Sequence, residues 1–238
     1  RFRSHWELEE YTLAENKRAG AARGKEYSMD KKLRETAETI LHSALRAVQP
    51  DAAVRRALEN AAFPGRVCLV AVGKAAWQMA HAAYETLGER ISGGIVVTKY
   101  EHARGPIGPL RIREAGHPVA DENSFAAAKE VLEMTAGLRA DDTVLFLVSG
   151  GGSALFELPL IEPAEQQAIT RQLLACGADI VEMNTIRKRL SAVKGGRFAQ
   201  HCSPAHVFSI VLSDIIGDPL DMIASGPAYP DASTEEQA

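Results

Sequence analysis

The sequence predicts a doubly wound α/β fold, in which a mostly parallel sheet has helices on both faces. Two apolar segments without polar alternation, Arg66–Val72 and Thr143–Val148, are typical of strands that are buried on both faces of a parallel sheet. Segments with the 3.6-residue period of amphipathic helices stand between the apolar segments. This alternation favours a doubly wound sheet, whose ligands bind at the carboxyl ends of the strands.

The first predicted elements are two helices and a buried strand. Apolar residues recur at helical spacing over 32–48, which predicts an amphipathic helix with one buried stripe. Asp51 is expected to cap a second helix, which continues to Leu58. The apolar segment that begins at Arg66 predicts a strand that stops at Gly73.

The middle of the chain continues the alternation of strands and helices. A helix is predicted over 75–87 and is closed by Gly88, since glycine commonly follows a helix end. Strands are expected at 94–98 and, at the periphery of the sheet, at 110–115. An alanine-rich helix over 121–138 begins at an aspartate that can cap it.

The last predicted elements are a strand, two helices and a final strand. The strand over 143–148 leads directly into a loop of three glycines between two serines. A proline begins a helix over 163–177, and a second helix follows over 180–193. The apolar segment 207–212 predicts the final strand.

Composition excludes several classes of function. The 238 residues carry a net charge of -4 and no block of Lys and Arg, so we expect neither nucleic-acid binding nor docking on an anionic membrane. The longest apolar segments, such as Val67–Val72, are far shorter than the about 20 residues of a membrane-spanning helix. Three cysteines without CxxC spacing favour a reducing cytoplasm over a disulfide framework or a zinc site.

The first 28 residues differ from the rest of the chain. They are rich in charge, have no convincing apolar face and contain no secretory signal. We interpret residues 1–28 as a non-native or disordered extension and Met29 as the natural start, with a genuine helical extension as the alternative. The folded domain is therefore expected over 29–238, and the last residues read as the approach to another element.

Four polar motifs begin where a predicted strand stops. They are Gly73–Lys74, Thr98–Lys99, Ser149–Ser153 and Ser213–Asp214. Because the carboxyl ends of parallel strands meet at one edge of a sheet, all four motifs are expected to face one crevice.

The loop of glycines and serines is the first candidate for binding an anion. Its residues are Ser149, Gly150, Gly151, Gly152 and Ser153. Successive glycines let backbone N–H groups approach a phosphate or carboxylate closely, and the hydroxyls add donors. A flexible tight turn is the alternative. The loop is no dinucleotide fingerprint, because Leu155 replaces the third glycine, and the chain has no P-loop.

Charged residues supply the remaining candidates. Lys74 opens a helix, where a lysine is unfavourable for stability, so it is expected to neutralise phosphoryl oxygens or hold a carboxylate. A surface lysine whose aliphatic stem lies along apolar surface is the alternative. Asp214 and Asp218 follow the last strand, where carboxylates can bind magnesium or accept a hydroxyl proton. Loop capping is the alternative for both. His117 can orient a substrate, or it is a hydrogen-bonded turn residue.

The last candidate is a cation-rich segment at the end of the helix that is predicted over 180–193. It contains Lys194, Gly195 and Gly196, a sequence that is typical of a phosphate approach. Cations in the last turn of a helix also stabilise it, by about 0.3–1 kcal/mol, so a structural role is the alternative.

Taken in this order, several motifs resemble the glycerate 2-kinase family. They are Val72–Ala76 (VGKAA), Glu114–Glu122 (EAGHPVADE), Ser149–Leu155 (SGGGSAL), Asn184–Gly196 (NTIRKRLSAVKGG), Leu212–Asp221 (LSDIIGDPLD) and Ala224–Pro227 (ASGP). The resemblance covers the chain from about residue 30 to its end.

The resemblance implies a fold, an activity and roles for the candidates. Its members have a Rossmann-like N-terminal domain and a smaller second domain, and they use ATP and Mg²⁺ to phosphorylate D-glycerate to 2-phosphoglycerate. By resemblance, Lys74 and Asp214 are catalytic, Asp214 and Asp218 bind the metal, and the glycine loop and Lys194–Gly196 bind substrate or phosphate. The second domain is absent from this sequence, so the chain alone is expected to bind ligand without necessarily turning it over. The oligomeric state stays open.

Two other functions stay open from the sequence. Proteins that resemble this family also carry the name hydroxypyruvate reductase, which would make the chain an NAD(P)H-dependent oxidoreductase. The incomplete glycine fingerprint argues against a nicotinamide site. A non-catalytic domain that binds a sugar phosphate is the other alternative.

Overall fold

The computed structural model describes residues 31–213 and 215–238 of the chain. One compact unit ends at Val48 and the next begins at Gln49. The predicted extension over 1–28 and the predicted catalytic Asp214 lie outside the described residues.

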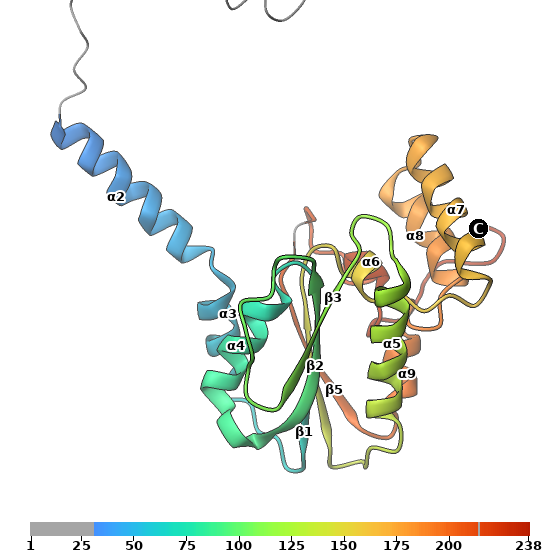
Figure 1. Cartoon of the computed structure of the whole chain (residues 1–238), viewed down its shortest axis with the longest axis horizontal. Helices are drawn as coiled ribbons and strands as arrows, with labels where there is room; N and C mark the ends of the chain where they lie inside the picture. Colours follow the sequence, from blue (N-terminus) through green and yellow to red (C-terminus); the bar gives the residue numbers. More distant parts are fainter. Residues whose placement is uncertain (1–30, 214) are drawn as a thin grey trace, which may run out of the picture. The chain divides into compact units, whose positions relative to one another are not determined.

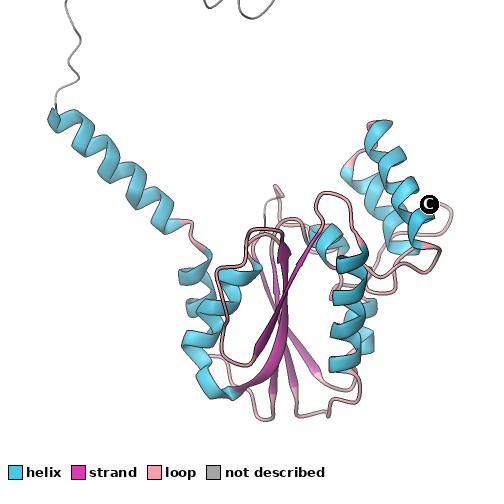
Figure 2. Ribbon diagram, in the orientation of Figure 1, coloured by secondary structure: helices cyan, strands magenta, loops and turns pink. Residues whose placement is uncertain are grey.

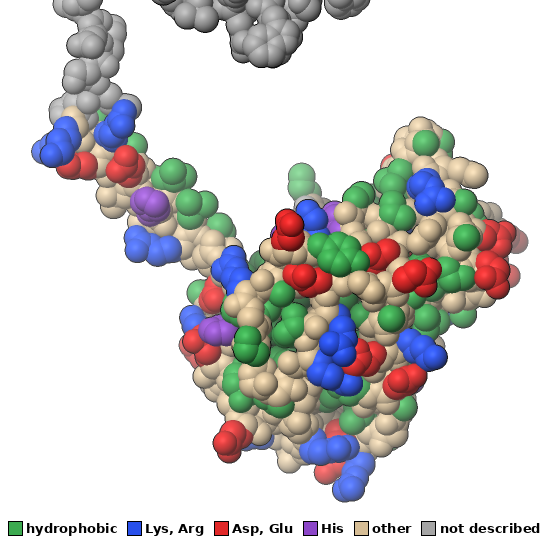
Figure 3. All heavy atoms as spheres, viewed as in Figure 1, with side chains coloured by type: hydrophobic (Ala, Val, Ile, Leu, Met, Phe, Trp, Pro, Cys, Tyr) green, Lys and Arg blue, Asp and Glu red, His purple; other side chains and the backbone are tan. Residues whose placement is uncertain are grey.

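The described part of the first unit is helix α2 (Lys31–Ala47). The helix predicted over 32–48 is thus confirmed within one residue at each end. None of its residues is buried, and the apolar Leu33, Ile40 and Leu41 are each more than half exposed. Figure 3 shows hydrophobic side chains along one side of the helix. The periodicity is present, but the expected burial of its apolar stripe is not.

The second unit contains one five-stranded parallel sheet (Figure 1). Its strands are β1 (Val67–Val72), β2 (Ile91–Lys99), β3 (Leu110–Ala115), β4 (Thr143–Val148) and β5 (His206–Val211). The order in the sheet is β3-β2-β1-β4-β5, so β1 and β4 are central and β3 is at an edge, as predicted. The predicted α/β fold class is confirmed.

Helices cover both faces of the sheet (Figure 1). The helices of this unit are α3 (Pro50–Leu58), α4 (Ala76–Leu87), α5 (Glu122–Thr135), α6 (Gly152–Leu155), α7 (Pro163–Ala175), α8 (Ile180–Arg189) and α9 (Arg197–His201), with short 3-10 helices η1 (Gly88–Arg90) and η2 (Ile223–Ser225). Helices α3 and α4 lie on one side of the sheet, and α5 and α9 lie on the other.

The central strands divide their side chains between two cores. In β1, Val70 and Val72 pack on the side of α5, whereas Leu69 and Ala71 pack on the side of α4. Strand β4 alternates in the same way. Because successive side chains of a strand point to opposite faces, an unbroken apolar segment supplies both cores.

Several predicted helix ends differ from the structure, among them the end of α5, which lies at Thr135 rather than at residue 138. The Asp121 side chain caps α5 as predicted, accepting from the Ser124 amide over 3.0 Å. The predicted cap at Asp51 is wrong, because Pro50 already occupies the first turn of α3. Helix α8 ends at Arg189 rather than near residue 193, because the following residues hydrogen-bond with the segment 158–160.

The sheet order places a topological switch point between β1 and β4, where successive connections leave in opposite directions. In Figure 2 the loops at the carboxyl ends of these strands lie at the upper edge of the sheet, beside α6. On the face seen in Figure 3, basic and acidic side chains are interspersed. Within residues 31–213 and 215–238, no helix is long and apolar enough to cross a bilayer.

Candidate active site

The loops that leave β1 and β4 are joined by hydrogen bonds at the switch point. The Lys74 amide donates to the Gly150 carbonyl oxygen over 2.9 Å. The Ala75 amide donates to the Ser149 hydroxyl over 3.0 Å. This hydroxyl is buried and also lies 3.5 Å from the Val72 carbonyl oxygen. The structure therefore places Ser149, which the sequence assigned to anion binding, against backbone groups.

Glycine is required where these loops approach one another most closely. A Cβ at Gly73, which has φ of +121°, would lie 2.2 Å from the Ser149 Oγ. Gly151 has φ of +88°, and a Cβ there would lie 2.9 Å from the His117 ring and 3.3 Å from the Lys74 Cγ. The loops that follow β1, β3 and β4 thus meet at Gly151.

Two backbone amides of the glycine loop have no acceptor in the described part of the chain. The amides of Gly150 and Gly151 donate to no acceptor within the described residues, whereas the Gly152 amide donates to the Ser149 carbonyl oxygen over 3.2 Å. Successive N–H groups in a turn with a left-handed residue form an anion-binding concavity. The part of the loop that fits the predicted anion site is therefore Gly150 and Gly151.

The hydroxyl of Ser153 begins a short hydrogen-bond chain. The Asn184 amide nitrogen donates to the Met222 carbonyl oxygen over 3.2 Å, which leaves Asn184 Oδ1 to accept from the Ser225 hydroxyl over 2.7 Å. Ser153 Oγ lies 2.9 Å from Ser225 Oγ. Since the Ser225 proton is engaged by Asn184, Ser153 donates to Ser225 and keeps its lone pairs as acceptors.

These groups line a cavity of about 600 Å³. Its walls include His117, Gly150, Gly151, Ser153, Arg187, Met222 and Ala224. Lys74 is exposed and lines a second cavity of about 200 Å³ with Gln78, His102 and Arg104. Because its Cγ also lies beside Gly151, Lys74 borders the glycine loop as well.

Asp121 holds the loop that carries His117. Its carboxylate accepts a hydrogen bond from the Gly116 amide, next to His117, and from the Tyr100 hydroxyl over 2.6 Å. These hydrogen bonds lower the pKa of Asp121 despite the opposing effect of burial. The same carboxylate caps α5, so the loop is fixed to the start of a helix.

Positive charge surrounds the half-buried His117. Burial lowers the pKa of His117 first, and neighbouring cations lower it further. These neighbours are Lys74, Lys99, His102 and Arg187. The imidazole is therefore favoured in its neutral form, and an anion in the cavity would reduce the repulsion.

Lys194 lies inside the protein. Its ammonium is fully buried, where it forms an ion pair with Glu157. Gln166 donates to the same Glu157 oxygen over 2.9 Å. Burial lowers the pKa of Lys194, and Glu157 opposes that effect. The structure does not bring this predicted phosphate ligand to the cavity.

The two glycines after Lys194 are also engaged within the protein. The Gly195 amide donates to the Ser225 carbonyl oxygen over 3.0 Å, and the Gly196 amide donates to the Gly226 carbonyl oxygen over 2.7 Å. Both glycines have positive φ, +59° and +81°, and Gly196 begins α9. Their amides hold the C-terminal segment instead of facing the cavity.

Of the two predicted metal ligands, Asp218 is described. It is exposed, has φ of +49°, and its carboxylate has no cationic partner within the described residues. Neighbouring Asp221 is paired with Lys188 over 3.4 Å. No group of three or more acidic, His or Cys side chains in the described chain is arranged to hold a metal ion. Asp218 alone cannot form a protein-only metal site.

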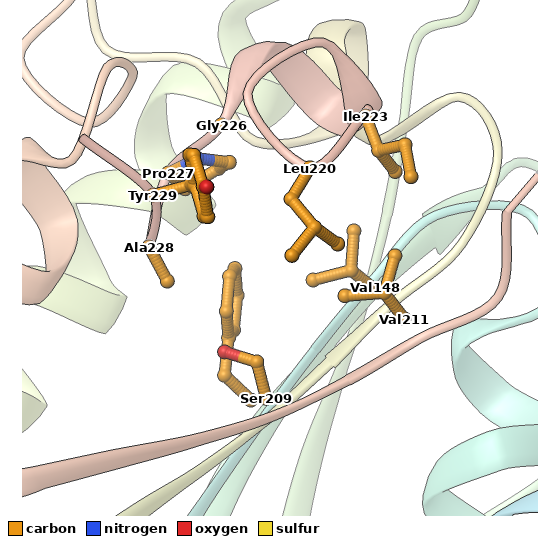
Figure 4. A pocket seen from close by; sticks show the side chains of 10 residues that line it. Val148, Ser209, Val211, Leu220, Ile223, Gly226, Pro227, Ala228 and Tyr229 are labelled. Carbon is orange, nitrogen blue, oxygen red and sulfur yellow. The ribbon is translucent and has the colours of Figure 1, made fainter. Parts of the chain in front are cut away.

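A smaller cavity of about 170 Å³ is apolar (Figure 4). Leu220 and Ile223 point toward Val148 of β4 and Val211 of β5, and the hydroxyls of Ser209 and Tyr229 are the polar side-chain groups of the lining. Ile223 lines this cavity, and the next residue, Ala224, lines the larger one. The lining carries no charged group, so we assign no phosphoryl chemistry to it.

Three residues to which the sequence assigned no site role lie at the cavity or in the hydrogen-bond chain behind Ser153: Arg187 lines the cavity, and Asn184 and Ser225 form the chain. Arg187 and Asn184 are three positions apart and therefore share one face of α8. That spacing was a usable signal, but the basic residues around Arg187 also fit a stabilised helix end. Ser225 belongs to a motif that carried the family resemblance, yet its partner became visible only in the fold.

Comparison with known proteins decides the family. The family model described as "Domain of unknown function (DUF4147)" matches residues 36–238. The chain belongs to this family. It is 56% identical over 208 residues to the D-glycerate 2-kinase of Thermotoga maritima. The matched residues cover 87% of this chain and 50% of that protein. The predicted membership of the glycerate 2-kinase family is confirmed.

Other relatives carry two different names. A glycerate 2-kinase of Pyrococcus horikoshii is 38% identical over 219 residues, covering 87% of this chain and 49% of that protein. A putative hydroxypyruvate reductase of Agrobacterium vitis is 41% identical over 207 residues, covering 86% and 47%. The crystal structure of the T. maritima glycerate kinase superposes with a TM-score of 0.81 at 55% identity, covering 87% and 50%. The chain spans about half the length of the curated relatives it matches.

Proposed function

We propose that this chain supplies the substrate-binding half of a kinase that phosphorylates D-glycerate with ATP. The 2-hydroxyl oxygen bonds to the terminal phosphorus, the bond from that phosphorus to ADP breaks, and the hydroxyl proton is released. The products are 2-phosphoglycerate and ADP. Lys74, His117 and the free amides of Gly150 and Gly151 converge at the switch point, and this is the observation that carries the proposal. Phosphoryl transfer depends mainly on such positioning and charge neutralisation.

Each of these groups has a role in the proposal. Lys74 neutralises the oxygens of the transferred phosphoryl group, and the Gly150 and Gly151 amides bind anionic oxygens. Ser153 accepts a hydrogen bond from the substrate hydroxyl, because its own proton is donated to Ser225. This acceptor orients the attacking oxygen.

The nucleotide and Mg²⁺ belong to the same proposal. Relatives named as kinases imply a nucleotide substrate, and we propose that it is ATP. Mg²⁺ bound to nucleotide phosphates needs only one or two protein carboxylates, which the unpaired Asp218 fits, with Asp214 as the second. When bound, the cation would neutralise phosphate charge.

We also propose that residues 29–238 are the first of two domains. The chain matches half of its relatives, and the resemblance implies a site that a second domain completes. A cytoplasmic location is favoured by three cysteines that are unpaired. Ser149 and Lys194–Gly196 then act indirectly, by holding the loops that carry the site.

The test is phosphorus NMR on the whole product of the natural gene, with D-glycerate, ATP and Mg²⁺. We expect 2-phosphoglycerate to form. Lys74→Met should lower kcat by about 10²–10³-fold, as expected when one group that stabilises the transferred charge is removed. Lys129→Met is the matched control, because Lys129 is an exposed lysine of α5. Unchanged ATP, or near-normal turnover by Lys74→Met, would contradict the proposal.

The second candidate is a reductase acting on hydroxypyruvate. The name of the A. vitis relatives favours it. Leu155 in place of the third glycine disfavours a dinucleotide site. An assay that monitors the absorbance of NADH or NADPH in the presence of hydroxypyruvate distinguishes the two activities, because only the reductase oxidises the nicotinamide. A protein that binds glycerate or phosphate but catalyses neither reaction would be the sugar-phosphate-binding domain.

A further inference from the structure

Arg187 is a buried cation that has no hydrogen-bond or ion-pair partner among the described residues. Its side chain lies on α8, lines the cavity of about 600 Å³ and is only 9% exposed. None of its N–H groups donates to an acceptor in the described part of the chain, and its Nε is buried without any hydrogen bond. Other arginines of the same segment have partners for their terminal nitrogens: Arg189 bonds to Ser233, although its Nε is also buried without a hydrogen bond, and Arg197 bonds to the carbonyl oxygens of Lys188 and Ser191.

The charges packed around Arg187 do not balance. Glu157 is the carboxylate that interacts with it electrostatically, but no ion pair within 4.0 Å joins the two. Glu157 is instead bonded to Lys194 and Gln166. Two buried cations therefore share one buried carboxylate. An uncompensated buried charge is costly, so a site of this kind favours an anion that enters from outside.

Other groups that line the cavity have the same preference. They are the amides of Gly150 and Gly151, which have no acceptor in the described chain, and the imidazole of His117, whose surroundings are cationic. Guanidinium groups bind carboxylates and phosphates through two parallel hydrogen bonds. Arg187 and these groups thus line one cavity of about 600 Å³, which is large enough for a small organic acid or a phosphate.

We propose that Arg187 binds an oxyanion of the reactants inside this cavity, either the carboxylate of the hydroxy acid or a phosphate group. The inference rests on the proposed function for the identity of the reactants, but the binding of an oxyanion can be tested alone. Arg187 then selects acids over the corresponding neutral alcohols, because a neutral ligand would leave its charge uncompensated.

The experiment measures binding to the 238-residue chain by calorimetry. The probes are D-glycerate, inorganic phosphate and glycerol, which lacks the carboxylate of glycerate. Arg187→Met keeps the length of the side chain without its charge, and Arg187→Lys keeps the charge without the planar fork. Arg171→Met is the control, because Arg171 is an exposed arginine on α7.

We expect Arg187→Met to lower the affinity for one of the two oxyanions by about 10- to 100-fold, the range for the loss of hydrogen bonds to charged groups. Arg187→Lys should recover only part of this loss, and Arg171→Met should bind like the wild type. Loss of D-glycerate affinity identifies a carboxylate site, and loss of inorganic phosphate affinity identifies a phosphate site. Unchanged affinity for both probes in Arg187→Met, or no binding of either to the wild-type chain, overturns the inference.

Thermal unfolding separates ligand binding from a structural role. Removing a charge that has no partner should leave the Tm of Arg187→Met equal to or above that of the wild type. If Arg187 instead serves to neutralise Glu157, the variant should melt at a lower temperature and bind the probes normally, which would overturn the inference. If the 238-residue chain binds an oxyanion through Arg187 but the whole product of the natural gene leaves ATP unconsumed, the proposed kinase is refuted and this inference stands.

Discussion

The Ser149 hydroxyl accepts a hydrogen bond from the Ala75 amide over 3.0 Å, although the two residues follow different strands. Helix α4 has no capping side chain of its own, and Ser149 satisfies an amide at its start. The loop that presents Gly150 and Gly151 is thereby fixed to the loop that presents Lys74. The hydrogen bond between Ser149 and the start of α4 therefore holds together the two loops that form the site on either side of the switch point.

Ser149→Ala should therefore reduce stability. We expect a loss of about 1–2 kcal/mol in the free energy of unfolding, the upper part of the range for removing a cap, because the hydroxyl is buried. Urea unfolding measures this loss. Ser203→Ala is the control, since the Ser203 side chain is exposed and makes no hydrogen bond within the described residues, and it should change stability by less than about 0.5 kcal/mol. A Ser149→Ala variant as stable as the wild type would remove the capping role.

Gly152→Ala should distort the wall of the cavity. A Cβ at Gly152 would lie 2.7 Å from the Ala224 Cβ, and Ala224 already has a strained φ of +51°. We expect a cost of about 1–3 kcal/mol in unfolding free energy, as for other overpacked sites. Adding Ala224→Gly should recover part of it, because that change removes both the clash and the strain.

The control for this pair is Gly93→Ala. A Cβ at Gly93 meets no atom within 4 Å, and its φ is not in the left-handed region. We expect it to be neutral or stabilising by up to about 1 kcal/mol. If Gly152→Ala is as stable as Gly93→Ala, the close packing of Gly152 against Ala224 is not real.

Strands and strand ends were predictable because their signals are local. The segment that forms β4 is apolar throughout, and the glycines that follow it mark the end of the strand. The roles of polar side chains depend on distant partners. Ser149 is engaged by a residue 74 positions away, and Lys194 by Glu157, 37 positions away. Arg187 is recognised as a candidate ligand-binding residue for the reverse reason, because its buried guanidinium has no partner among the described residues.

Asp142 should make stability sensitive to acid. Its carboxylate accepts from the Arg139 amide over 2.9 Å and from the Arg66 guanidinium over 2.8 Å, and these contacts hold its pKa well below the usual value. A depressed pKa stabilises the fold above the unfolded value of about 3.9, and this contribution disappears as pH falls toward the folded value. Asp142→Asn should therefore be less stable than the wild type at neutral pH.

The difference in unfolding free energy between wild type and Asp142→Asn should shrink as the pH is lowered from about 5 to 2. Urea unfolding at a series of pH values measures it. Asp141→Asn is the control, because Asp141 is exposed and its side chain makes no hydrogen bond within the described residues. A difference that stays constant with pH would show that Asp142 does not act through its charge.

His117 should report the occupancy of the cavity. Burial and the neighbouring cations lower its pKa, so removing one of those cations in Lys74→Met should raise it. Adding D-glycerate should also raise it, because an anion reduces the repulsion that the protonated imidazole meets. Binding then takes up protons, and the affinity for D-glycerate should increase as the pH falls through the titration of His117. The carboxyl of glycerate does not itself titrate in that range, so the proton uptake belongs to the protein.

NMR of the histidine ring resonances across pH 5–8, the range in which His normally titrates, measures this change. His206 opens β5, at the end of the sheet opposite the cavity, and its resonances are the internal reference that should not respond to D-glycerate. Arg187→Met should raise the pKa of His117 in the free protein and reduce the further rise on adding D-glycerate if Arg187 holds the carboxylate. A His117 titration that is the same with and without saturating D-glycerate would place the acid outside the cavity, because an anion bound among these groups must change the charge that His117 experiences.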